Sequence, residues 1–324
     1  MHAEAVQNDT ELFPVPLAVM QPGTLSPVDL YIRVKTPTHF VLYKRCHAAL
    51  YERTRQRLLD RGVSLLYLRR ADEDTYHEYV EQNLAAIIRD DLLPVEKSCE
   101  LVYDTSARVM MEVFEDPRSG RSIARARAMV EATVLAILKR HDSLWHMRTL
   151  ASHDYRTYTH CVHSCMFLVA TAKGLLKVED APALNRIGLG GILHDIGKSR
   201  IPDAILSKPH KLTPAEFEEV KKHPLTGLEI ARQSKRLPRV AAQIIRSHHE
   251  RLDGSGYPDG LSAPEISQTV RLSSIIDVYD ALTTDRPYAR ARTPYQALEM
   301  MMRETKGQLD DALLRAFVKF LGPT

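Results

Sequence analysis

The chain has 324 residues, of which 44% are hydrophobic, and a formal net charge of +3. This hydrophobic fraction is large enough for two ordinary domains with buried cores, which excludes a chain dominated by disorder. Because Lys and Arg residues are interspersed with Asp and Glu, the mild positive charge does not indicate binding to duplex DNA.

The first residues are acidic, with Glu4, Asp9 and Glu11, and lack the basic-then-apolar order of a signal peptide. The sequence also has no apolar run of the roughly 18 residues that span a bilayer. We therefore expect a cytoplasmic protein that does not enter a membrane.

The cysteines are too few and too scattered for a disulfide framework, which also indicates a reducing compartment. They are Cys46, Cys99, Cys161 and Cys165. The pair Cys161 and Cys165 is one helical turn apart and has no matching second pair, so we expect buried thiols there and not half of a metal site.

The chain begins with a proline-rich stretch, residues 1–27, that has few periodic apolar positions and is predicted to be an extended leader. Alternating segments follow at 29–34 and 38–43, around the Thr36-Pro37 turn. This pattern is typical of a β-hairpin.

The next elements complete a small α/β module. Residues 48–60 are predicted to be helical and to end near Gly62, residues 64–68 form a third strand, and residues 72–90 form an amphipathic helix. The module has neither a recognisable cofactor motif nor the phosphoacceptor pattern of a receiver domain. We expect a regulatory input module whose ligand is unknown.

Apolar residues then recur at helical spacing over 95–114 and 121–139, with a break at 116–120. These helices are predicted to connect two modules, and their amphipathic period makes them the candidate dimer interface. Beyond residue 141 almost every apolar stretch has helical period.

The predicted fold class is therefore α+β overall, with a small α/β domain followed by an all-α domain. The expected domains are residues 1–115 for the regulatory module, 116–140 for the connecting helix and 141–324 for the helical domain.

The most informative motif is Leu193-His194-Asp195-Ile196-Gly197-Lys198. A His-Asp pair alone means little, since the pairs at 141–142 and 153–154 are expected to lie at the surface. The third pair ends an apolar helix, where ionisable groups are costly unless they are paired or bound to metal. His223, the pair His248-His249 and the turn Gly256-Tyr257-Pro258 follow it downstream.

This set of residues predicts a site for two divalent ions. Imidazole nitrogens and carboxylate oxygens suit intermediate divalent metals, and one carboxylate can give an oxygen to each of two ions. Asp195 is the candidate bridge. Two such ions would supply what attack on a phosphodiester near neutral pH needs, a deprotonated water and charge neutralisation.

Four stretches of the second domain, at 193–202, 208–224, 248–260 and 277–288, resemble the HD-GYP family of cyclic dinucleotide phosphodiesterases. The match includes Lys208-Pro209, Lys222-His223-Pro224 and Asp285-Arg286-Pro287-Tyr288. The resemblance covers the second domain and does not extend to the first.

The resemblance implies a ligand set for each ion. One ion would be held by His160, His194, Asp195 and Asp277, and the other by Asp195, His223, His248 and His249. His163 lies one helical turn after His160 and remains an alternative to it. Arg156 stands where some family members have a glutamate associated with a third metal, so we expect two ions. The resemblance favours iron or manganese, and nickel or zinc also suit these ligands.

The resemblance also places Lys198 beside the scissile phosphate, where it would stabilise charge or protonate the departing 3′ oxygen. Residues 253–260, here called the Gly-Tyr-Pro loop, would put Tyr257 at the rim of the site. Arg286 would contact phosphate or guanine, and Asp280 or Asp154 would accept hydrogen bonds from guanine.

The expected function is hydrolysis of cyclic di-GMP to linear pGpG, with further hydrolysis to GMP, in bacterial second-messenger signalling. One alternative is a mixed GMP-AMP ring as substrate. Another is a slow or inactive sensor or protein-docking module with the same fold. The expected partners are cyclic di-GMP, a second copy of the chain, and a diguanylate cyclase or adaptor that contacts the Gly-Tyr-Pro loop.

Overall fold

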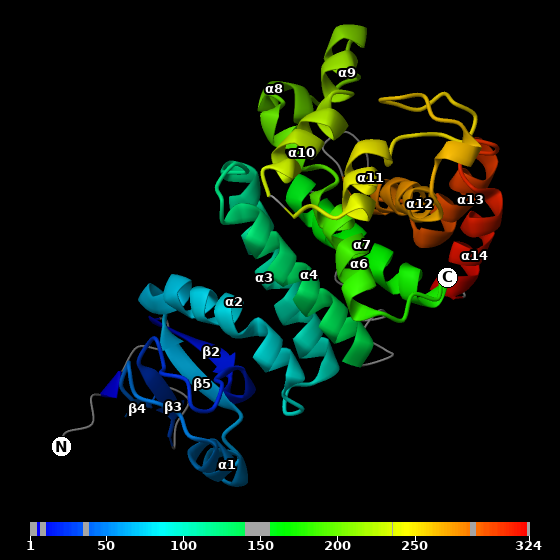
Figure 1. Cartoon of the computed structure of the whole chain (residues 1–324). Helices are drawn as coiled ribbons and strands as arrows, with labels where there is room; N and C mark the ends of the chain where they lie inside the picture. Colours follow the sequence, from blue (N-terminus) through cyan, green and yellow to red (C-terminus); the bar gives the residue numbers. More distant parts are fainter. Residues whose placement is uncertain are drawn as a thin grey trace. The chain divides into compact units, whose positions relative to one another are not determined.

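The computed structural model describes most of the chain, namely residues 5–6, 11–34, 39–139, 156–234, 236–285 and 290–322. The chain divides into two compact units, Met1–Ser98 and Cys99–Thr324. The first unit contains a β-sheet and the second is helical (Figure 1). The α+β class is therefore confirmed. The expected domain limits at residues 115 and 140, which separate a regulatory module, a connecting helix and a helical domain, stay predictions.

The first unit is built on one antiparallel sheet with the strand order β1-β4-β3-β5-β2. Its strands are β1 (Ala5–Val6), β2 (Leu12–Pro16), β3 (Leu30–Arg33), β4 (Phe40–Lys44) and β5 (Leu65–Arg69). The predicted hairpin is confirmed as the β3–β4 pair, and the predicted helices are α1 (Glu52–Asp60) and α2 (Glu73–Arg89). Leu12, Tyr31 and Phe40 form a buried cluster of this sheet.

The prediction of an extended leader over residues 1–27 is wrong, because β2 pairs with β5 along its whole length. Pro14 and Pro16 hid this strand from sequence reasoning, since proline cannot donate to a central ladder. β2 is an edge strand, where proline is tolerated. The following residues are also part of the core: Leu17 is fully buried, and the amide of Gln21 donates to the hydroxyl of Tyr79 in α2 at 2.7 Å.

The second unit is an array of helices. Its described α-helices are α3 (Val95–Glu115), α4 (Ser122–Lys139), α6 (Thr157–Gly174), α7 (Ala181–Leu193), α8 (Asp203–Leu206), α9 (Pro214–Val220), α10 (His223–Arg232), α11 (Arg239–Ser247), α12 (Gln268–Thr283), α13 (Pro294–Glu304) and α14 (Asp311–Leu321). The predicted helices at 95–114 and 121–139 are confirmed as α3 and α4. Between residues 156 and 322, the described part of this unit has only an isolated bridge, Asp253 to Ser262, and no strand.

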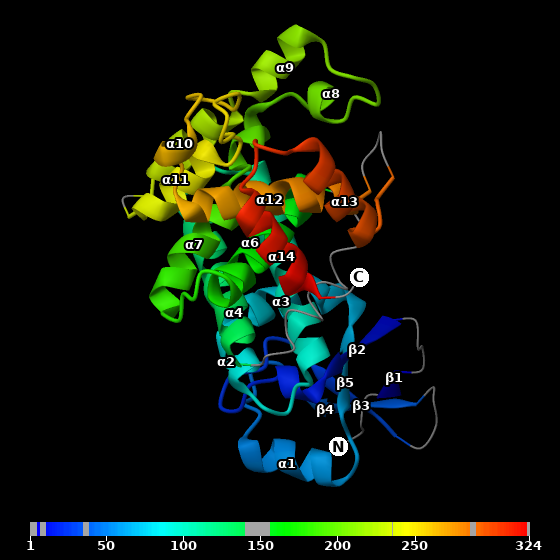
Figure 2. The same ribbon diagram turned by 90° about the vertical axis from the view of Figure 1, so that its right-hand side faces the viewer.

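Helix α7 lies at the centre of the unit, in contact with α4, α6 and α11. Asp180 begins it by accepting a hydrogen bond from the amide of Ala183 at 2.8 Å, which satisfies one of the amides left open at a helix start. Helix α12 packs against α6, and Figure 2 shows α14 against both of them. This packing brings the end of α7 and the middle of α12 to one side of α6, where the predicted ligands lie.

None of the helices in the described ranges is both long and apolar enough to cross a membrane.

Candidate metal centre

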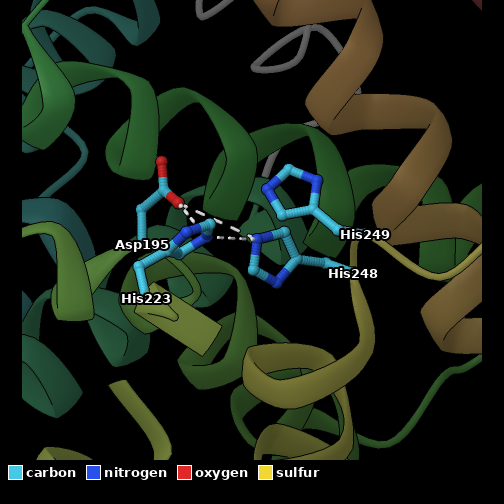
Figure 3. A group of neighbouring side chains, drawn as sticks. All are labelled: Asp195, His223, His248 and His249. Atoms are coloured by element: carbon cyan, nitrogen blue, oxygen red, sulfur yellow. Dashed lines mark hydrogen bonds and ion pairs between the residues drawn. The ribbon is translucent and has the colours of Figure 1, made fainter. Parts of the chain in front are cut away.

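The structure brings all seven predicted metal ligands together from separate helices. His160 lies in α6, His194 and Asp195 follow α7, His223 opens α10, and the remaining ligands come from the end of α11 and from α12. Their ligand atoms form two groups, each within 4.8 Å: Asp195, His223, His248 and His249 in one, and His160, His194 and Asp277 in the other. Figure 3 shows the first group, with the rings of His223 and His248 facing the Asp195 carboxylate.

The hydrogen bonds of three histidines determine which ring nitrogen carries the proton. Nδ1 of His194 lies 2.8 Å from the carbonyl of Gly191, and Nδ1 of His223 lies 2.7 Å from that of Val220. Nδ1 of His248 lies 3.1 Å from two carbonyls of α11. Because a carbonyl can only accept, each Nδ1 carries the hydrogen and each Nε2 presents a lone pair to the centre.

His160 follows the same rule, since its Nδ1 donates to the carboxylate of Asp280 at 2.6 Å. In the neutral tautomer that this bond favours, Nε2 of His160 and Nε2 of His194 face each other as lone pairs at 3.1 Å, and Nε2 of His160 also lies 3.1 Å from a carboxylate oxygen of Asp277. The Nε2 atoms of His223 and His248 do the same at 3.3 Å. Facing lone pairs repel unless a cation lies among them, so this donor set fits divalent metal ions.

The carboxylate of Asp195 gives a second, independent indication that these residues fit divalent metal ions. Its Oδ1 is buried and has no hydrogen-bond partner, although it lies 3.1 Å from Nε2 of His223. Its Oδ2 accepts a hydrogen bond from Nζ of Lys198 at 2.6 Å. A buried carboxylate oxygen that faces only lone pairs is costly, and coordination of a cation would remove that cost.

The electrostatics of the centre keep these groups in the protonation states that metal binding requires. Burial lowers the pKa of His194 to about 3 and also lowers the pKa of His223, so both rings are neutral near pH 7. Burial alone would raise the pKa of Asp195, but the ammonium group of Lys198 beside it holds that pKa well below its usual range. The centre therefore combines neutral imidazoles with ionised carboxylates.

Gly197 explains how the motif after Asp195 reaches the helix that carries His223. A Cβ at this position would lie 2.0 Å from the carbonyl oxygen of His223 and 2.6 Å from the amide nitrogen of Gly227. The backbone of the short helix η4 (Ile196–Arg200) therefore lies directly against the first turns of α10. This close contact positions Asp195 relative to His223.

Tyr257 lies beside the first ligand group, with its ring centroid 4.7 Å from that of His249. Burial raises the pKa of Tyr257, so its hydroxyl stays protonated. Gly256 allows the close approach of the Gly-Tyr-Pro loop, because a Cβ there would lie 2.4 Å from the amide nitrogen of Arg251. The predicted position of Tyr257 beside the ligands therefore agrees with the structure.

Glu250 is a residue that sequence reasoning missed. Its side chain is buried, and its two carboxylate oxygens accept hydrogen bonds from the amides of Asp259 at 2.7 Å and Leu261 at 2.9 Å. Arg246 adds a two-pronged bond to the carboxylate of Asp259. These contacts anchor the Gly-Tyr-Pro loop to the end of α11. The only signal in the sequence was an acid directly after the His248-His249 pair.

The prediction that Asp280 contacts guanine does not agree with its position. The residue is 1% exposed, and its oxygens face Nδ1 of His160 at 2.6 Å and Nδ1 of His163 at 3.1 Å. Asp280 therefore lies behind His160 and orients its ring. Nε2 of His163 lies 3.2 Å from the hydroxyl of Tyr103, so His163, the alternative to His160, belongs to neither ligand group.

Two predicted substrate contacts, Asp154 and Arg286, lie outside the described residues. Arg156 is exposed at the start of α6. The prediction of buried thiols is confirmed for Cys161 and Cys165, and burial raises the pKa of Cys165 to about 12.

Comparison with known proteins identifies the class. Residues 127–313 match the family described as HD domain, which is more than half of the chain. The chain therefore belongs to the HD domain family, and the expected membership is confirmed.

Three curated relatives carry more specific names. The chain is 37% identical over 224 residues to the cyclic di-GMP phosphodiesterase PA4108 of Pseudomonas aeruginosa, covering 68% of this chain and 53% of that protein. It is 42% identical over 153 residues to the cyclic di-GMP phosphodiesterase response regulator RpfG of Xanthomonas campestris, covering 46% of this chain and 39% of RpfG. It is 42% identical over 134 residues to the 3′3′-cGAMP-specific phosphodiesterase 2 of Vibrio cholerae, covering 40% and 26%.

The chain thus spans about half the length of PA4108 and smaller shares of the other two relatives. Among solved structures, Bd1817, an HDG"Y"P protein from Bdellovibrio bacteriovorus, matches 96% of this chain and 100% of its own, with a TM-score of 0.66 at 20% identity. That likeness establishes the fold of the chain.

Proposed function

We propose that the chain is a metal-dependent phosphodiesterase that hydrolyses cyclic di-GMP to linear pGpG and further to GMP. The observation that carries this proposal is the convergence of unprotonated Nε2 atoms on the buried carboxylate of Asp195, with the ammonium group of Lys198 beside it. The names of PA4108 and RpfG support cyclic di-GMP as the substrate.

The ligand set is proposed for two divalent ions, iron or manganese, with Asp195 between them. Bound there, the ions would lower the pKa of a water molecule and neutralise charge on the phosphate. The chain itself contributes by fixing the tautomer and the orientation of the donor atoms. The carbonyls of Gly191 and Val220 fix the tautomers of His194 and His223, and Asp280 does so for His160.

The reaction forms a bond between a water oxygen and phosphorus and breaks the bond from phosphorus to the 3′ oxygen. The departing 3′ oxygen must gain a proton. Lys198 is the candidate donor, because its ammonium group lies at the centre while its side chain is still 16% exposed to solvent. The imidazoles of His194 and His223 cannot take this part, since their Nε2 atoms carry no hydrogen.

The Gly-Tyr-Pro loop is proposed to orient the substrate at the rim of the centre. The hydroxyl of Tyr257 stays protonated and can donate to a phosphate or ribose oxygen. Glu250 and Arg246 hold the loop against α11, so the position of Tyr257 is set before a substrate arrives. Arg286 and Asp154 stay proposed contacts with phosphate and guanine.

A mixed cyclic GMP-AMP substrate is the second candidate, because relatives 42% and 36% identical to the chain are named 3′3′-cGAMP-specific phosphodiesterases. The two substrates differ in one base and share the phosphodiester chemistry. They can be separated by the ratio of kcat/KM values measured with each ring under the same conditions.

The decisive experiment is anaerobic purification of the chain, metal analysis and incubation with cyclic di-GMP, followed by identification of the products by chromatography. We expect pGpG, then GMP, from the wild type and no product from Asp195→Asn. A wild-type sample that contains its full complement of metal and forms neither product would contradict the proposal and favour a sensor.

The first unit is proposed to regulate the second, and its ligand is unknown. A homodimer through the amphipathic helices α3 and α4 is a further proposal, as is contact of the Gly-Tyr-Pro loop with a diguanylate cyclase or adaptor. Light scattering that finds only monomers over a range of concentrations would contradict the dimer.

A further inference from the structure

A cavity of about 420 Å³ opens in the second unit, away from the candidate metal centre. Its lining residues come from the turn between α3 and α4, the first turns of α4, and the end of α10 with the residues that follow it. Figure 1 shows where these elements lie in the chain. None of the seven predicted metal ligands lines it. Nothing in the proposed function uses this cavity, so its role is a separate question.

The charged side chains that line the cavity are all positive. Arg118, Arg127 and Arg236 line it, and no aspartate or glutamate in the described ranges does. None of these three side chains forms an ion pair with a described carboxylate, whereas their neighbour Arg125 pairs with Glu112 at 2.6 Å. Arg118 and Arg236 are exposed and Arg127 is half-buried, with one guanidinium nitrogen 3.3 Å from the carbonyl of Arg236, so solvent screens much of their repulsion and an anion among them would add attraction. Guanidinium groups bind phosphate with two parallel hydrogen bonds, which makes phosphate the matching anion.

The rest of the cavity indicates a ligand larger than an inorganic ion. Ala124 is exposed and lines the wall, with the mostly buried Ile123 beside it, so the wall has an apolar part. A volume of about 420 Å³ lies within the range of small-molecule sites, roughly 300–1,000 Å³. Ile123 and Ala124 also belong to the first turn of α4, whose open amides favour a negative group.

We propose that this cavity is a second ligand site, which binds a phosphorylated small molecule of the size of a nucleoside monophosphate. The phosphate would lie among Arg118, Arg127 and Arg236, and a flat ring would contact Ile123 and Ala124. This proposal does not depend on the activity of the metal centre.

The test is equilibrium binding of GMP to the full chain, measured by calorimetry. In the double variant Arg118→Gln/Arg236→Gln, GMP should bind about tenfold more weakly or worse, because hydrogen bonds to a charged group are lost. Both arginines are exposed, so their replacement should leave the fold and the metal content unchanged. Arg127→Lys keeps the charge but not the planar fork, and it should weaken GMP binding as well.

The matched control is Arg61→Gln/Arg315→Gln, which removes the same charge from two exposed arginines outside the cavity. It should bind GMP as the wild type does. All samples are measured in the same metal state, so that any binding of GMP at the metal centre contributes equally to each of them. Equal GMP affinity in the cavity variant and the wild type, or an equal loss in the control, would overturn the proposal.

Two further probes test the class of ligand. Guanosine, which lacks the phosphate, should bind more weakly than GMP, and inorganic phosphate, which lacks the ring, should also bind more weakly. If inorganic phosphate binds the wild type as tightly as GMP, the ligand size is wrong. Turnover of cyclic di-GMP in the same samples tests the proposed function separately, because GMP binding in the cavity and turnover at the metal centre can each be absent without the other.

Discussion

At the scale of single residues, the candidate centre depends on where each histidine places its proton. A carbonyl or carboxylate behind the ring of His160, His194, His223 and His248 takes the Nδ1 hydrogen. The inward Nε2 atoms are then acceptors only. Within this arrangement Lys198 donates a hydrogen bond to the Asp195 carboxylate, and its proposed role as proton donor is distinct from that of the ligands.

Replacing Lys198 with Ala should lower kcat by about 100-fold or more, the usual size of a lost general acid. Metal content per chain should not change, because the lysine is not a ligand. Steady-state kinetics and elemental analysis measure the two effects, and Lys319→Ala in α14 serves as an exposed control. A variant with full turnover would remove the proposed role of Lys198.

Replacing Asp280 with Asn should weaken metal binding by about 10–100-fold, as expected when the group that orients a ligand histidine is changed. An amide cannot accept with both of its ends, so either His160 or His163 loses its partner. Metal titration of the variant and of the exposed control Asp203→Asn checks this. Equal metal affinity in the two variants would show that Asp280 does not position His160.

The sequence could predict which seven residues meet at the centre, because their motifs are local and specific. It could not predict the roles of Asp280 and Glu250. Neither acid stands in a motif that assigns its role. The role of Asp280 depends on contacts between α6 and α12, and that of Glu250 on the return of the Gly-Tyr-Pro loop to the end of α11. Asp280 was for this reason assigned to the substrate when it in fact lies behind a ligand.

At the scale of secondary-structure elements, the contact between η4 and α10 determines the position of Asp195 relative to His223. The contact is made by backbone against backbone, with Gly197 on one side and His223 and Gly227 on the other. Any side chain at Gly197 would separate these two elements and displace Asp195 from His223.

Gly197→Ala should therefore lower the free energy of unfolding by about 2 kcal/mol or more, the cost of forcing an extra methyl group into a packed contact. It should also reduce the metal bound per chain. Chemical denaturation measures the first effect and elemental analysis the second. Gly120→Ala is the matched control, since nothing lies within 4 Å of a Cβ at that position. If both variants are as stable as the wild type, the contact does not constrain the centre.

The elements themselves were predictable where the pattern was local. Helical periodicity predicted α2, α3 and α4, and alternation predicted the β3–β4 hairpin. Strand β2 was not predictable, because its prolines oppose the assignment and its partner β5 lies about fifty residues further along the chain. Its place is determined by burial against the sheet, which overrides local propensity.

At the scale of the whole molecule, the metal ligands connect helices that are distant in the sequence. For example, His160 of α6 and Asp277 of α12 lie 117 residues apart in the sequence and 3.1 Å apart at the centre. Bound ions would thus stabilise the second unit as a whole, and the first unit contains none of these ligands.

Removing metal with a chelator should lower the stability of the second unit by about 3–4 kcal/mol, the value expected for a ligand present at 100–1,000 times its dissociation constant. This corresponds to a fall in Tm of about 10 °C for a unit of this size. Hydrogen exchange locates the effect: protection should fall in α6, α10 and α12 and stay unchanged in α2. A uniform loss of protection in both units would contradict the prediction.

The edge strand β2 of the sheet in the first unit contains two prolines, Pro14 and Pro16. An exposed edge strand with free amide hydrogens can pair with a strand of a neighbouring chain and start aggregation. Proline has no amide hydrogen, so the outer side of β2 offers few donors to such a strand. The same residues that hid β2 from sequence reasoning therefore make this strand a poor partner for a strand of another chain.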